Sequence, residues 1–249
     1  MYSILFHVFV GVLLFVLPFI SYLYTVSIFA FGVFYIVKNK NKNNEALLIS
    51  AYVVSVEVLL RMTKGVILNE FGKYSVLLFM FLGMIYSGFS KTALIYWIFL
   101  LLLIPGVILA SLTLDFKTDI RKAIAFNLSG AVCLGFCAIY CFQRQITFDR
   151  LLSVFRSFSL PLISLAVYLF LYAPSVKDVV TGTQSNFETS GGFGPNQVAT
   201  ILGLGVFIFF VQFVFNSKSI LLQIINAGFV AIFAFRGIVT FSRGGIYTA

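Results

Sequence analysis

Long apolar runs recur along this chain, and they restrict its possible folds more than any other feature. A run of about 20 residues crosses a hydrocarbon layer of about 30 Å as an α-helix. Only 10% of the 249 residues are charged, whereas a soluble protein is nearer to one-quarter charged. Backbone polar groups in lipid have to be bonded within their own segment, and the alternation of barrel strands is not seen. The sequence therefore predicts an all-α, polytopic integral membrane helical bundle.

The apolar runs predict nine transmembrane helices within a single transmembrane domain that covers residues 1–249. The predicted spans are residues 3–17, 22–37, 46–62, 74–89, 93–112, 123–142, 158–173, 198–215 and 220–241. The first run has no basic segment before it, so it is not a cleavable signal. We find no internal repeat and no linker long enough to separate two domains.

The net charge of +9 indicates contact with membrane lipids of negative charge or with an anionic substrate. We expect no nucleic acid partner, because no basic cluster alternates with aromatic residues on a soluble domain. The densest basic tract is residues 38–44, and placing it in the cytoplasm puts the N-terminus there too. Basic residues then divide almost equally between the two sides. The outer face is unusually basic in this orientation, as a face that receives an anionic substrate would be.

Two ionisable residues, Glu57 and Arg61, lie four positions apart near the outer end of the third predicted span. At that spacing they can pair across one helical turn. Charged groups within a span are costly, so they indicate either a cavity or a pair that fixes helix packing. Arg144, Arg150 and Arg156 fit an amphipathic segment on the cytoplasmic membrane surface.

The sequence offers no metal site and no hydrolase triad. Its three cysteines, Cys133, Cys137 and Cys141, form one stripe on a predicted helix, where packing explains them. His7 is the single histidine, and no acidic residue is near it in sequence, so we assign it to packing or to the membrane interface. We expect no metal and no cofactor.

The most polar and glycine-rich point of the chain is the segment 191–197, with the sequence GGFGPNQ. Its glycines and proline predict a fixed loop. Asn196 is positioned to cap the helix that follows, and a helix N-terminus favours an anionic group. Near the end of the chain come Arg236 and then TFSRGG, which contains Arg243. Arginine offers a planar fork of donors that suits phosphate oxygens, although a span-end anchor is the simpler explanation of Arg243.

The two motifs GGFGPNQVATILGLG (residues 191–205) and TFSRGG (residues 240–245), in this order and within this hydropathy, resemble the O-antigen ligase/polymerase family of bacterial membrane glycosyltransferases. The resemblance covers about the last 70 residues. It implies a helical fold of the GT-C type and inverting, metal-independent glycan transfer. The donor is a glycan on undecaprenyl diphosphate, and the acceptor is a lipid or another glycan. The reaction takes place on the outer face of the bacterial cytoplasmic membrane.

Carried onto this sequence, the resemblance makes Arg243 the catalytic residue that holds the diphosphate leaving group. Asn196 and Gln197 would line the substrate cavity. Arg236, Lys177 and Arg61 would be weaker substrate-binding residues, because none of the three matches a motif of the family.

The family pattern continues beyond TFSRGG with further spans and a large outer loop that carries a histidine. This sequence ends shortly after the motif, so we expect it to be the N-terminal part of a longer protein. Two other classes of function stay open. A transporter or flippase of a lipid-linked or anionic substrate also places basic residues at a cavity, although usually with repeats. A noncatalytic membrane scaffold would need neither Arg243 nor Asn196.

Overall fold

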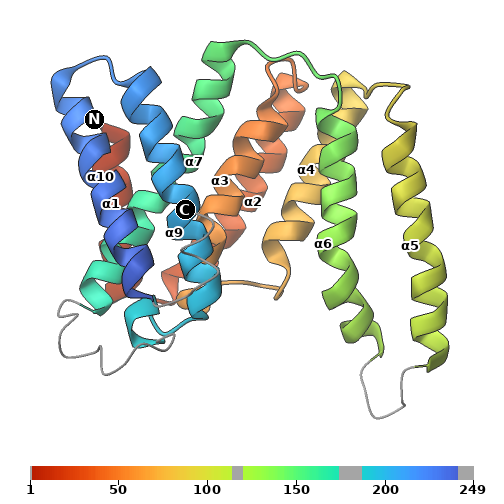
Figure 1. The fold of residues 1–249 in the computed structure, drawn as a ribbon, viewed down its shortest axis with the longest axis horizontal. Helices are drawn as coiled ribbons and strands as arrows, with labels where there is room; N and C mark the ends of the chain where they lie inside the picture. Colours follow the sequence, from red (N-terminus) through yellow and green to blue (C-terminus); the bar gives the residue numbers. More distant parts are fainter. Residues whose placement is uncertain (1, 114–119, 174–186, 241–249) are drawn as a thin grey trace. The chain divides into compact units, whose positions relative to one another are not determined.

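The computed structural model describes residues 2–113, 120–173 and 187–240, and this part of the chain is helical with no strand (Figure 1). In chain order the elements are α1 (Tyr2–Val16), α2 (Ile20–Asn39), α3 (Glu45–Met62), α4 (Phe71–Ser87), α5 (Leu94–Thr113), α6 (Ile120–Cys141), α7 (Phe148–Tyr172), the short 3-10 helix η1 (Glu188–Ser190), α9 (Pro195–Val211), the π-helical turn η2 (Gln212–Asn216) and α10 (Ile220–Val239).

Six stretches of the described chain are helical, long and apolar enough to cross a membrane. They comprise α2, α5, α6, α7, α9 with η2, and α10, while α1 and α4 are shorter apolar helices. The described residues therefore confirm the all-helical fold, and their six long apolar helices support a membrane protein. Each of the nine predicted spans overlaps one α-helix, and length and composition support a membrane crossing for six of these helices.

The seventh helix differs most from its predicted span. It begins at Phe148, well before the expected start at residue 158. Arg150 and Arg156 therefore belong to the first turns of α7 and not to a separate surface segment. Pro161 accordingly lies inside the helix. The prediction placed the start of this helix at its first purely apolar stretch. Basic residues are tolerated near the end of a helix, so the helix can begin before that stretch.

The contacts divide the chain into two compact units. The first unit contains residues 1–28, 51–67 and 148–249, and the second contains residues 29–50 and 68–147. In the first unit α1 packs against α7, and α9 packs against both α7 and α10. Its buried core includes Leu14 of α1, Leu162 of α7 and Leu202 of α9.

Glycines set the closest helix contacts of the first unit. A Cβ on Gly11 of α1 would lie 2.7 Å from the backbone oxygen of Ser164 on α7. A Cβ on Gly205 of α9 would lie 2.6 Å from the Phe233 ring of α10. The rings of Phe209 and Phe233 stack with centroids 5.3 Å apart. Small residues allow helices to approach closely in membranes, where packing drives association. These contacts hold α1 against α7 and α9 against α10, and the candidate site lies at the ends of α7, α9 and α10.

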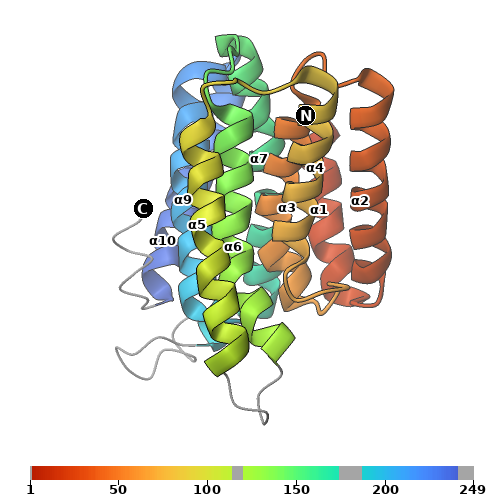
Figure 2. The same cartoon turned by 90° about the vertical axis from the view of Figure 1, so that its right-hand side faces the viewer.

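In the second unit α6 packs against both α4 and α5. Figure 2 shows α5 and α6 side by side. Gly135 of α6 receives Leu100 of α5, since a Cβ there would lie 2.5 Å from the leucine side chain. No residue of α5 is buried within the described part of the chain, which fits a helix with lipid around most of its surface.

Candidate functional site

The ends of four helices meet on one side of the first unit. Gly191, in the loop before α9, lies against Met62 at the end of α3 and against Leu169 of α7. On α10, Gly237 faces Leu202 of α9, about two turns from the start of that helix. The segment 187–197 thus lies at the C-terminal ends of α3 and α7 and at the N-terminal end of α9.

The glycine-rich loop before α9 forms a turn with a defined backbone conformation. Gly191 and Gly192 have φ angles of 68° and 72°, a region that residues with side chains rarely adopt. The Gly192 N–H donates to the Phe187 carbonyl at 2.9 Å. Thr189 and Ser190 of η1 are buried. The loop therefore needs both glycines for its backbone, as the sequence predicts.

The prediction that Asn196 caps α9 is wrong. Gly194 occupies the N-cap position, no side chain caps this end, and Pro195 is the first helical residue. Proline favours that position because it has no N–H to leave unbonded and its φ already fits a helix. Asn196 and Gln197 are displaced into the first turn, where both are exposed. The Gln197 side chain lies beside Gly194.

Arg236 is the most unusual polar group on this side of the first unit. It is only 6% exposed. Its Nη2 donates to the Ala173 carbonyl, just after the end of α7, at 3.0 Å. Its Nη1 is buried and has no hydrogen-bond partner among the described residues. Within that part of the chain no carboxylate forms an ion pair with it. A buried cation with unused donors is costly, so Arg236 indicates a binding site for an anion.

An apolar groove runs from Arg236 along α7 and α10. Its volume is about 420 Å³. Arg236 lies at the end of the groove that is nearest the C-terminus of α10, and the other lining side chains are apolar, with Phe170 and Phe235 largely exposed. The groove is lined by Ala166, Val167, Phe170, Leu171, Phe229, Ile232, Phe235 and Arg236. Its chemistry suits a molecule that has a long apolar chain and an anionic group at one end.

The predicted pairing of Glu57 with Arg61 is confirmed. Arg61 donates from Nε at 3.1 Å and from Nη2 at 2.6 Å to one carboxylate oxygen of Glu57. Both side chains keep about a fifth of their surface exposed, at 21% and 19%. The carboxylate neutralises Arg61, so this residue is a weaker candidate for an anion site than Arg236.

The remaining sequence candidates differ in what can be said of them. Lys177 and Arg243 lie outside the described residues. Asn196 and Gln197 are on the same side of the first unit as Arg236, because they follow the loop that contacts α7. The sequence analysis did not predict the groove, although a pattern in the sequence indicates it. Apolar residues at 229, 232 and 235 lie next to Arg236 on one face of a helix.

His7 joins three helices and has no open position. The Ser3 carbonyl can only accept, so the bond of 2.7 Å to it requires a proton on Nδ1 of His7. In the neutral ring, Nε2 then accepts from the Tyr52 hydroxyl at 3.0 Å, and the Tyr24 hydroxyl lies 2.6 Å from that of Tyr52. The Ser164 hydroxyl donates to the His7 carbonyl. These bonds support the assignment of His7 to packing.

No group of three metal-ligating side chains is present in the described part of the chain. Cys133, Cys137 and Cys141 lie on α6 and form no disulfide. Comparison with models of protein families, with curated proteins and with solved structures gives no match. The function therefore has to be argued from the residues of this chain.

Proposed function

We propose that this protein transfers or polymerises a glycan carried on undecaprenyl diphosphate, at the outer face of the bacterial cytoplasmic membrane. The observation that carries the proposal is the buried Arg236 at the end of an apolar groove. A polyprenyl diphosphate has the same arrangement, with a long apolar chain that ends in a strongly anionic group. The acceptor in this proposal is a lipid or another glycan.

The free donors of Arg236 support a role at the diphosphate. Nη2 is fixed by the Ala173 carbonyl, so the guanidinium plane is held while Nη1 keeps its hydrogens for a ligand. Charge-assisted hydrogen bonds to phosphate oxygens are among the strongest in proteins. Negative charge grows on the leaving diphosphate as the glycosidic bond breaks. A preorganised cation at that position stabilises the transition state more than the ground state.

The loop before α9 supports a role at the sugar. It contacts Leu169 near the end of α7, and the Ala173 carbonyl that accepts from Arg236 follows directly after this helix. Asn196 and Gln197 present exposed amides on the following turn, and amides bond readily to sugar hydroxyls. On sequence grounds we assign the leaving diphosphate to Arg243 as well, and secondary binding roles to Lys177 and Arg61.

The topology supports an outer active face. With the basic tract 38–44 in the cytoplasm, helices that alternate in direction end outside at α3, α7 and α10, and α9 begins there. Arg61 and Arg236 then lie near the outer surface. A lipid-linked glycan that has already crossed the membrane would meet the groove at this level.

A transporter or flippase of a lipid-linked substrate is the second candidate, because one observation favours it. The π-helical turn η2 directly follows α9 at its C-terminal end, and π-helical geometry is often found at functional sites, such as the path of a transported substrate. The apolar groove would serve a moving lipid equally well. The two functions differ in their product, since an enzyme leaves a covalently lengthened or transferred glycan and a flippase leaves its substrate unchanged.

The test is to incubate the full chain in vesicles with an undecaprenyl-diphosphate-linked glycan and acceptor. Released undecaprenyl diphosphate and lengthened glycan are then measured. The proposal predicts both products, and Arg236→Gln should lower the rate by about 10²–10³-fold. Lys91→Gln, which removes an exposed cation elsewhere, is the matched control. Movement of intact substrate without any covalent product would overturn the enzyme proposal in favour of the transporter.

A further inference from the structure

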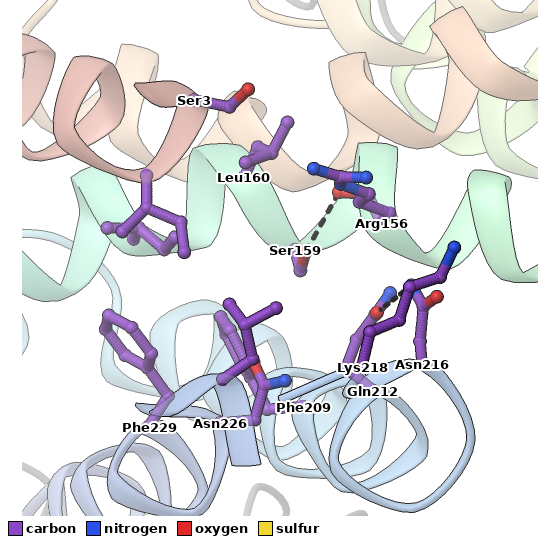
Figure 3. A pocket seen from close by; sticks show the side chains of 13 residues that line it. Ser3, Arg156, Ser159, Leu160, Phe209, Gln212, Asn216, Lys218, Asn226 and Phe229 are labelled. Atoms are coloured by element: carbon purple, nitrogen blue, oxygen red, sulfur yellow. Dashed lines mark hydrogen bonds between the residues drawn. The ribbon is translucent and has the colours of Figure 1, made fainter. Parts of the chain in front are cut away.

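A second cavity lies at the opposite end of α7, α9 and α10 in the first unit (Figure 3). Its volume is about 160 Å³, which holds several water molecules at about 30 Å³ each. Arg156 in its wall and Ala173 beside Arg236 are separated by about 25 Å along α7, at 1.5 Å per residue. That separation approaches the hydrocarbon thickness of about 30 Å. The cavity and Arg236 therefore lie near opposite faces of the membrane.

The wall of this cavity is cationic. Figure 3 shows Arg156 on α7 across the cavity from Lys218, which follows η2. Both side chains are exposed, and neither forms an ion pair within the described residues. No acidic side chain lines the cavity. Two cations on facing walls, with no carboxylate between them, create a positive potential that attracts an anion.

The wall of the cavity contains a buried side-chain N–H, that of Gln212, which has no partner among the described residues. Gln212 is 5% exposed, and its Nε2 has no hydrogen-bond partner among the described residues. Its Oε1 is already used, since it accepts from Nδ2 of Asn216 at 2.6 Å. Buried polar groups in proteins are nearly always hydrogen-bonded, so this N–H requires an acceptor inside the cavity, which a water or an oxygen of a ligand can supply.

The turn that carries Gln212 is held in place by neighbouring side chains. The Ser217 hydroxyl donates to the Gln212 carbonyl at 2.9 Å. The same hydroxyl accepts from Nδ2 of Asn226 on α10, also at 2.9 Å. Ser219 then caps α10 by accepting from the Leu222 N–H. The π-helical geometry of η2 is of a kind often found at functional sites. The donors of the cavity are thus prepositioned and not free to relax away.

We propose that this cavity, here called the amide pocket, binds the phosphate group of an anionic ligand at the membrane face opposite to Arg236. Arg156 and Lys218 pair with phosphate oxygens, and Nε2 of Gln212 donates to one of them. The rings of Phe209 and Phe229 line the inner part, which suits an apolar portion attached through the phosphate ester. A phospholipid headgroup and a soluble phosphate share this chemistry. The proposal does not depend on the proposed glycan transfer.

The experiment uses the full chain purified in an uncharged maltoside detergent. One arm adds phosphatidylglycerol, and the other adds inorganic phosphate against chloride at the same ionic strength. The rise in thermal unfolding temperature gives the half-saturating concentration in each arm. The test variants are Arg156→Gln with Lys218→Gln, and Gln212→Glu, which places a negative charge at the orphaned donor. The control removes two exposed cations of the second unit, Lys42→Gln with Lys91→Gln.

The amide pocket predicts that wild-type and control proteins are stabilised, while both test variants need roughly tenfold more ligand or more. Such an effect with phosphatidylglycerol alone identifies a lipid headgroup, and an effect with inorganic phosphate identifies a soluble ligand. Equal titrations of the test variants and the control in both arms would overturn the proposal. Unfolding temperatures without ligand show whether the variants are folded.

Discussion

The sharpest prediction about stability concerns Asn41, whose buried side chain forms several hydrogen bonds between helices of the second unit. It is 1% exposed and has a φ of 51°. Its Nδ2 lies 2.8 Å from both the Ser87 and Tyr140 hydroxyls and 3.2 Å from the Gly83 carbonyl. Its Oδ1 accepts from the Ala46 N–H at 2.9 Å. One side chain therefore ties the start of α3 to α4 and α6.

The cost of Asn41→Ala follows from these contacts. The amide has two hydrogens for its three acceptors, so the variant loses the equivalent of about three hydrogen bonds at about 1 kcal/mol each. Alanine also tolerates the left-handed backbone poorly, which adds about 1–2 kcal/mol. The free energy of unfolding should fall by about 4–5 kcal/mol in total. Asn41→Gly avoids the backbone strain, although glycine gains freedom on unfolding, so it should lose about 3–4 kcal/mol.

The assay is denaturant unfolding of the purified protein in detergent micelles. Asn39→Ala is the matched control in the same tract, because among the described residues the Asn39 side chain makes one hydrogen bond, to the Tyr35 carbonyl, at 2.8 Å. We expect that control to stay within about 1 kcal/mol of wild type. If Asn41→Ala has the same free energy of unfolding as the control, the hydrogen bonds of Asn41 do not stabilise the second unit and the reasoning is refuted.

Two further predictions concern the first unit. Gly11→Ala should lower the free energy of unfolding by about 1–3 kcal/mol, because the new methyl group meets the Ser164 carbonyl. Gly228→Ala is its control, since no atom lies within 4 Å of the new methyl group, and it should be neutral or stabilising in the same unfolding assay. Glu57→Gln should change stability by less than about 1 kcal/mol, since its ion pair with Arg61 is partly exposed. Equal costs for the two glycine variants, or a large loss for Glu57→Gln, would contradict these readings of the packing.

The sequence predicted the helices well where hydropathy decides them. The helix starting at Leu94 and the one ending at Cys141 lie close to their expected bounds. It failed where polar residues belong to a helix or to the core. The first turns of α7 were missed because they contain Arg150 and Arg156, and charged residues end the apolar run from which the start of the helix was predicted. The burial of Asn41 could not be foreseen from a tract that reads as a solvated loop, since its partners lie in other helices.

The candidate site was predictable where local sequence determines it and not where packing between helices does. The backbone angles of Gly191 and Gly192 follow from local chemistry, and so does the pairing of Glu57 with Arg61. The burial of Arg236 and its bond to Ala173 depend on how α10 meets α7. Local sequence favours a span-end anchor for such an arginine, and only the packing shows an unused donor at the end of a groove.

The most direct test of the central claim is a binding measurement that compares two lipids differing only in the headgroup. Undecaprenyl diphosphate and the uncharged alcohol undecaprenol are titrated into the detergent-solubilised wild-type protein and into Arg236→Gln. We predict that wild type binds the diphosphate at least tenfold more tightly, and that the variant binds the two lipids about equally, because the groove is kept and the charge is lost. Equal affinities in wild type, or an unchanged preference in Arg236→Gln, would contradict a lipid diphosphate site at Arg236.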